Sequence, residues 1–202
     1  MFGAALTGAV TLSPDGIAAG EIAGRRVALA PLGRLAGLAL EGRGEMALTL
    51  GERQGMQDAS LSLTARRIEL DLAALAGETL SLDQVELTAA LRDLHGAGRI
   101  AARLGAAGGA AGNTVFNEIA ARATGPFDAI ALEARLAGER LTLRNEPVAF
   151  SADGIWQADA LTVTALSLTL GETSMALAQP LRLGMPAGGG LEMPQLALAF
   201  AG

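Results

Sequence analysis

The sequence lacks cysteine and tyrosine, and only 3% of its 202 residues are aromatic. Without cysteine it has neither a disulfide framework nor thiolate ligands for zinc. All 15 basic residues are arginines, and 21 acidic residues leave a net charge of -6. No basic cluster is larger than pairs such as Arg25-Arg26 and Arg66-Arg67, which argues against a nucleic-acid partner. Charges and glycines interrupt every long apolar run, so we expect no transmembrane helix.

Half of the residues are apolar, and leucine, alanine and glycine supply most of the apolar volume. A core built from leucine and alanine is thin, because aromatic side chains usually contribute the largest buried areas. Residues 1–14 are uncharged but have no basic segment at their start, so they indicate a strand and not a signal peptide. We therefore expect any export signal or membrane anchor to lie outside this chain, which we interpret as a fragment of a longer one.

The stretch 160–183 has the pattern of a β-hairpin. Leu161 and Val163 alternate with threonines, residues 171–174 form a turn, and alternation resumes at Met175 and Leu177. The apolar positions are odd-numbered up to Ala165 and even-numbered from Leu166 onward. A change of parity inside one strand requires an extra residue, so we predict a β-bulge near 165–166.

The same change of parity occurs at Arg66-Arg67 and between Leu82 and Val85. These changes predict short strands joined by bulges and bends, which suit a strongly curved sheet. The fold class expected is all-β: an antiparallel sheet of short strands, few or no helices, and a U-shaped apolar groove, with about ten to fourteen strands. The strands expected are Ala5–Leu12 and residues 17–22, 26–32, 38–50, 59–72, 80–91, 127–136, 141–143, 148–151, 160–170, 175–183 and 196–200.

Residues 104–113 are rich in alanine and glycine and predict a low-complexity break within a single repetitive domain spanning 1–202. The following residues, 113–123, fit either a strand or one to two helical turns, and we favour the strand. Gly188-Gly189-Gly190 predicts a flexible break before the last strand.

Residues suited to catalysis are scarce. His95 is the only histidine, and neither a nucleophile motif nor a zinc-ligand spacing accompanies it. Gly96-x-Gly98-x-x-Ala101 formally matches a dinucleotide fingerprint, but that motif needs a following helix, which the next glycines oppose. We therefore predict no enzyme activity, no catalytic residue, no metal site and no cofactor, with His95 in a solvated turn.

The apolar stripes allow two interpretations, since alternation looks the same in a closed core and in an open groove. Trp156 is interpreted as a packing residue in preference to a ligand contact. The residues predicted to line an apolar groove, if it is open, are Leu161, Val163, Leu166, Leu168, Leu170, Met175 and Leu177.

A run of motifs resembles the repeating segment of the TamB family of translocation and assembly module proteins. Asp153-Gly154-Ile155-Trp156 precedes the leucine-rich strand, which ends in Leu170-Gly171-Glu172-Thr173 and is followed by Ala178-Gln179-Pro180-Leu181-Arg182-Leu183. Ala123-Thr124-Gly125-Pro126-Phe127-Asp128 is similar too. The resemblance covers most of the chain in pattern and residues 125–183 in motif-like detail.

The resemblance implies a long AsmA-like β-sheet groove in the periplasm, whose parent protein is anchored in the inner membrane. It also implies a role in outer-membrane biogenesis, through phospholipid transport and outer-membrane protein assembly with a TamA-like barrel partner. The expected partners are thus phospholipid acyl chains and that barrel, the latter through parts of the parent chain not present here. The alternative is a structural β-repeat spacer, as in adhesins or passenger domains, with a closed dry core and no ligand.

Overall fold

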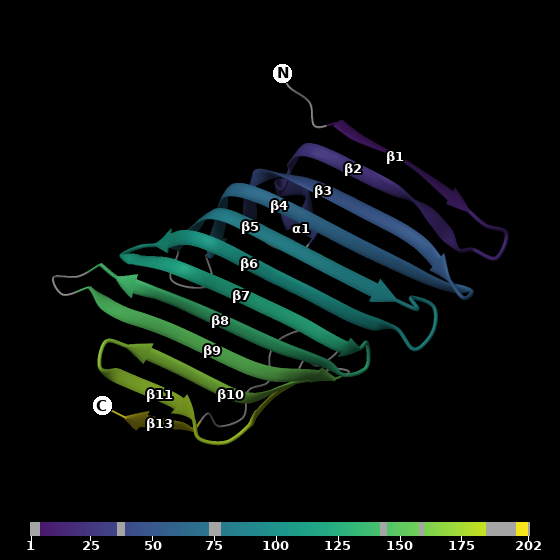
Figure 1. Cartoon of the computed structure of the whole chain (residues 1–202). Coiled ribbons are helices and arrows are strands. Elements are labelled where there is room, and N and C mark those ends of the chain that lie inside the picture. The colour runs from purple at the N-terminus through teal and green to yellow at the C-terminus, as the bar shows by residue number, and fades with distance from the viewer. Residues whose placement is uncertain are drawn as a thin grey trace.

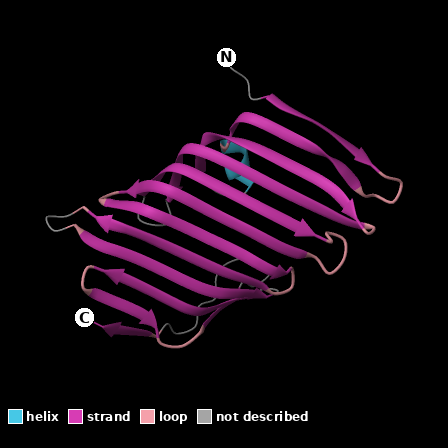
Figure 2. Ribbon diagram, viewed as in Figure 1, coloured by secondary structure: helices cyan, strands magenta, loops and turns pink. Residues whose placement is uncertain are grey.

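The computed structural model describes residues 5–35, 39–72, 78–141, 145–157, 160–184 and 197–201 and forms one antiparallel sheet of 13 strands (Figures 1 and 2). One short helix, α1 (Ala30–Leu35), interrupts the strands. The strands are β1 (Ala5–Leu12), β2 (Ala18–Ala28), β3 (Ala39–Arg53), β4 (Met56–Leu72), β5 (Glu78–Arg92), β6 (Arg99–Ala111), β7 (Thr114–Pro126), β8 (Ile130–Arg140), β9 (Glu146–Gln157), β10 (Ala160–Leu170), β11 (Thr173–Leu177), β12 (Leu181–Gly184) and β13 (Leu198–Ala201).

The strands follow one another across the sheet in chain order from β1 to β11, and each pairs with its sequence neighbours. At the far end, β11 and β12 share one edge of β10, and β13 pairs with β11. The two outer strands, β1 and β13, do not pair with each other, so the sheet is open and not a closed barrel (Figure 1). The predicted all-β antiparallel fold is confirmed.

The register gives the sheet one apolar face and one polar face. Because directly opposite residues point to the same side, each row of cross-strand partners belongs to one face. One such row reads Leu63, Leu87, Leu104, Ala121, Ala134, Ala152 and Leu166. The next row along reads Thr64, Glu86, Gly105, Ala120, Arg135, Ser151 and Ser167. We call these two sides the apolar face and the polar face.

The parity changes in the sequence correspond to irregularities inside long strands. In β10 the register with β9 shifts between Val163 and Ala165, which confirms the predicted bulge. In β4 the extra residue lies beside Arg67, whose backbone has a φ of 53°, and the register with β3 shifts there. The expectation of short strands was wrong, because the bulges bend continuous strands; β4 has 17 residues.

The small buried core lies at one end of strands β4–β6, on the apolar face. It comprises Leu29, Ala65, Ile68, Val85 and Ala106. Leu29 directly precedes α1, and its N–H donates to the carbonyl of Gly42 at 3.1 Å. In Figure 1 the helix lies behind β4 and β5, and it contacts β3. The core therefore forms where the chain after β2 turns back over the apolar face.

Two expectations about the elements need correction. Residues 17–22 and 26–32 are not two strands: β2 runs through Ala18–Ala28, and α1 takes up the end of the second segment. Proline fits there because the first turn of a helix needs no N–H at Pro31. The stretch 104–113 is not a break, since residues up to Ala111 belong to β6 and pair on both sides.

The remaining strand expectations fare better. In the stretch 113–123 the preferred strand is confirmed, because β7 begins at Thr114 and runs past residue 123. Strands cover the other predicted segments, with bounds that differ by a few residues, except that 127–129 precede β8 and 178–180 separate β11 from β12. Two expectations, most of the strand at 141–143 and the break at 188–190, lie outside the described residues.

Candidate functional site: a hollow on the apolar face

The apolar face is hollowed over strands β5 to β10. The hollow has a volume of about 390 Å³ and crosses six neighbouring strands. Its apolar side chains come from Leu87 on β5 and Leu161 and Val163 on β10, with Ala102, Leu104, Ala121, Ala123, Leu132, Ala134 and Ala152 between them. The antiparallel meander assembles this surface from residues that lie up to 76 positions apart, 163 minus 87.

Small side chains create the depth of this hollow. Between the leucines of the outer strands, β7 and β9 contribute Ala121, Ala123, Ala152 and Gly154. Gly154 is buried, and a Cβ there would lie 3.2 Å from Leu161 Cδ1, so the chain is already in close contact at this point. Larger residues on these strands would fill the space that the alanines leave open.

Charged residues also border the hollow, but they belong to the other side of the sheet. Arg103, Arg122, Glu133 and Asp153 form one cross-strand row that alternates with the apolar rows. Alternation puts their side chains on the polar face, so only their backbone contributes to the hollow. The surface inside is therefore uncharged and suited to a hydrocarbon ligand.

No second layer of structure covers the hollow among the described residues. Leu104 is 36% exposed in its centre, and Leu161 and Val163 are half-buried. Within the described parts of the chain, α1 is the element that packs on the apolar face, and it does so at the bent end of β3–β5. A folded protein rarely leaves a continuous apolar surface of this kind uncovered unless something binds to it.

The residues predicted to line a groove all lie on the apolar face, but only two border the hollow. Leu161 and Val163 are part of its wall. Leu166 and Leu168 continue the same face along β10, and Met175 lies opposite Leu168 on β11. Leu170 lines a second hollow, and Leu177 pairs with Leu198 of β13.

Sequence reasoning missed the contribution of strands β6 to β9. Ala102, Ala121, Ala134 and Ala152 were not among the predicted groove residues, yet they define the shape of the hollow. The available signal was the alternation of alanine with arginine or glutamate in 101–104, 120–123 and 131–136, which indicates half-buried strands with one small-residue face.

The second hollow lies where the apolar face reaches the strand ends. It has a volume of about 340 Å³, and Thr114, Arg140, Val148 and Leu170 contribute to its lining. Thr114, Arg140 and Glu146 are successive cross-strand partners, and Arg140 is exposed. Glu146 extends toward Gly171, where a Cβ would lie 3.7 Å from its carboxyl carbon. On β8 the row of small and apolar residues on this face therefore ends at the guanidinium of Arg140. The row consists of Leu132, Ala134, Leu136 and Gly138.

The residues considered for chemistry lie away from both hollows. His95 is exposed in the turn between β5 and β6, as predicted. Gly96 and Gly98 are followed by strand β6 and not by a helix, which excludes a dinucleotide fingerprint. Trp156 is half-buried on the apolar face, opposite Leu161 and Ile130. In the described part of the chain, no group of His, Asp and Glu side chains has the spacing of a metal site.

The fold and the hollow define the structural class of this chain. It is an open antiparallel sheet with one apolar face, and that face carries the hollow. Comparison with protein-family models, with curated proteins and with solved structures found no match to this chain. No helix within the described ranges has the length and apolarity needed to span a bilayer.

Proposed function

We propose that the apolar face binds the acyl chains of phospholipids and that the chain is a segment of a lipid-conducting groove. The single observation that supports this most is the uncovered, uncharged hollow over β5–β10. Acyl chains gain about 0.8 kcal/mol for each CH₂ removed from water, so binding requires no specific polar pocket. A surface of this kind would hold hydrocarbon at any position along its length, as conduction requires.

The arrangement of polar groups is consistent with this proposal. The apolar rows run parallel to one another across strands β3 to β9, and the charged side chains in the row beside the hollow lie on the opposite face. Head groups would remain at the strand ends, in water, where Arg140 and Thr114 border the second hollow. A guanidinium at that position suits the phosphate of a phospholipid.

The wider role follows from the resemblance to the TamB family and is part of the same proposal. In it, the segment belongs to a groove in the periplasm, held by an inner-membrane anchor of the parent protein. It serves phospholipid transport and outer-membrane protein assembly with a TamA-like barrel partner. No catalytic step is part of this role. The competing function is a structural spacer whose apolar face is covered in the mature assembly.

A photocrosslinking experiment on the full chain tests the lipid proposal. A photoreactive amino acid at Leu104 or Leu161, within the hollow, is expected to form adducts with phospholipid in vesicles of phosphatidylethanolamine and phosphatidylglycerol. The matched control is Ile155, an apolar side chain of the neighbouring strand that is 40% exposed on the polar face. Adducts at Leu104 and Leu161 but not at Ile155 would support the groove.

Two other results would contradict it. Absence of lipid adducts at all three positions would favour the spacer. Protein–protein crosslinks from Leu104, with no lipid adduct, would mean that a second copy covers the apolar face and that the face is a dry interface.

A further inference from the structure

Three arginines surround a separate hollow on the polar face over β2–β4, far along the sheet from the apolar hollow. The hollow has a volume of about 310 Å³ and is lined by Arg26, Arg43, Gly44, Glu45, Thr64 and Arg66. All three arginine side chains are exposed. Such a concentration of positive charge is unexpected in a chain whose net charge is -6.

The positive charges are held together at a cost in stability. Arg43 and Arg66 are direct cross-strand partners on β3 and β4. Like charges in this relationship destabilise a sheet. Within the described residues, the ion pair present is that of Arg53 with Asp58 at 3.6 Å, so no described carboxylate lies within 4 Å of these guanidinium groups. The arginines are therefore free to bind an external anion.

The backbone at Arg26 supports the same interpretation. Arg26 has a φ of 57°, in the left-handed region that arginine rarely adopts. It lies in the bulge of β2, between Gly24 and Val27, where the register with β3 shifts. The bulge adds a third arginine beside the Arg43–Arg66 pair, and strained non-glycine residues of this kind are concentrated at functional sites.

The remaining polar groups of the hollow indicate the charge of the ligand. Glu45 and Thr64 are cross-strand partners on the same face as Arg43 and Arg66. The buried Gly44–Ala65 pair lies between these two pairs and faces the other side of the sheet. Three guanidinium groups and one carboxylate leave a charge of +2 (3 minus 1). A dianion would neutralise this charge, and the Thr64 hydroxyl can donate one further hydrogen bond.

We propose that Arg26, Arg43 and Arg66 form a binding site for a phosphate dianion, either free phosphate or the phosphate monoester of a ligand. The planar, multiply donating guanidinium matches phosphate oxygens in pairs, and three of them can enclose the group from three strands. The site is on the opposite face from the lipid groove, so it does not depend on the groove.

Thermal unfolding of the full chain in phosphate tests this site. At pH 8 and matched ionic strength, millimolar inorganic phosphate is expected to raise Tm by about 2–4 °C relative to chloride. Arg43→Gln and Arg66→Gln should abolish this shift. The matched control is Arg103→Gln on the same face, which also has an arginine, Arg122, as its cross-strand partner but lies outside the hollow. Arg103→Gln should keep the full shift.

A vesicle arm distinguishes the source of the phosphate. Co-sedimentation with phosphatidic acid vesicles, compared with phosphatidylcholine vesicles, measures binding to a lipid phosphate monoester. A preference for phosphatidic acid that the double variant R43Q/R66Q loses would assign the site to a lipid head group, and a Tm shift without that preference would assign it to a soluble phosphate. No Tm shift together with no vesicle preference, or effects that persist in R43Q/R66Q, would overturn the proposal.

Discussion

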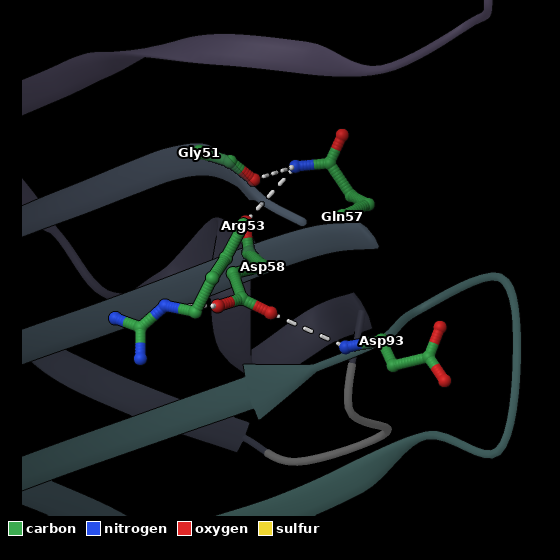
Figure 3. A network of polar contacts seen from close by, with 5 residues as sticks. All are labelled: Gly51, Arg53, Gln57, Asp58 and Asp93. Carbon is green, nitrogen blue, oxygen red and sulfur yellow. Dashed lines mark hydrogen bonds and ion pairs between the residues drawn. The ribbon is translucent and has the colours of Figure 1, made fainter. Parts of the chain in front are cut away.

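The side-chain amide of Gln57 pairs with the backbone of Ala18 as a second strand would. Its Oε1 accepts from the N–H of Ala18 at 2.6 Å, and its Nε2 donates to the carbonyl of Ala18 at 2.9 Å. The same Nε2 also donates to the carbonyls of Gly51 and Asp58, and Gln57 is 5% exposed (Figure 3). One side chain at the start of β4 therefore fixes the start of β2 across the intervening β3.

Replacement of Gln57 by leucine should destabilise the chain, although it puts an apolar side chain at a buried position. The change leaves partly buried backbone groups of Ala18, Gly51 and Asp58 without this partner, which costs about 1–3 kcal/mol. Urea denaturation should show this loss. Gln84→Leu is the control, since Gln84 makes one exposed hydrogen bond, to Glu86, and should change stability by less than about 0.5 kcal/mol. Equal losses in both variants would show that the network contributes nothing.

Arginine substitutions on the apolar face should separate the open region from the core. Leu168→Arg is expected to fold, because its half-exposed position lets the guanidinium reach water, whereas Ile68→Arg, at 4% exposure, buries an unpaired charge and should unfold the chain. Leu166→Arg should behave like Leu168→Arg. Circular dichroism and lipid crosslinking measure the two effects. Unfolding of the Leu166 and Leu168 variants as well would mean that this part of the face is closed.

Two glycines at interior strand positions should respond in opposite ways to alanine. A Cβ at Gly138 would meet the carbonyl oxygen of Val115 and lie 3.0 Å from Phe116 Cα, so Gly138→Ala should weaken the β7–β8 pairing. A Cβ at Gly105 would have no atom within 4 Å, and Gly105→Ala should stabilise by about 0.5–1 kcal/mol through lower chain entropy. Midpoints of urea denaturation compare the two variants. A neutral Gly138→Ala would contradict the contact.

His95→Ala should leave both stability and lipid binding unchanged within about 0.5 kcal/mol. His95 is exposed in its turn, and the turn is held by other groups, including the Asp93 carboxylate, which accepts from the N–H of Ala97 at 2.9 Å. Asp93→Ala is the comparison that should destabilise this turn. Loss of phospholipid crosslinking in a folded His95→Ala variant would give the histidine a role that its position does not indicate.

The sequence predicted where single strands bend, but not how the bends of neighbouring strands line up across the sheet. Alternation along a strand is local, so the parity change at 165–166 indicated the bulge that the register confirms. The parity changes at Arg67 in β4 and between Leu82 and Val85 in β5 lie side by side, since Ile68 is opposite Leu82 and Ala65 is opposite Val85. The sequence could not predict this, because the alignment depends on how the two strands pair. The two irregularities are one bend shared by adjacent strands.

Only the part of the hollow that lies on β10 was predicted, because the rest also depends on how the strands pair. Leu161 and Val163 stand out as large apolar residues in an alternating strand, whereas the depth of the hollow comes from alanines on four other strands. The alanine- and glycine-rich composition of 104–113 predicted an interruption of the strand pattern there. At Gly109 close contact requires the small residue, because a Cβ there would lie 2.7 Å from the carbonyl oxygen of Ser81. Helix α1 was missed because an apolar run as short as 26–32 does not distinguish strand from helix.

The meander order of the strands has a consequence for how the chain folds. From β1 to β11 each strand pairs with the one before and the one after it, so contacts join elements that are neighbours along the chain. Coupling restricted to neighbouring strands makes the stability of the sheet close to a sum of terms for adjacent strand pairs. Folding should therefore start at the bent end, where Leu29, Ile68 and Val85 supply the buried area, and extend strand by strand toward β13. The C-terminal strands would then be the last to form and the first to exchange their amide protons.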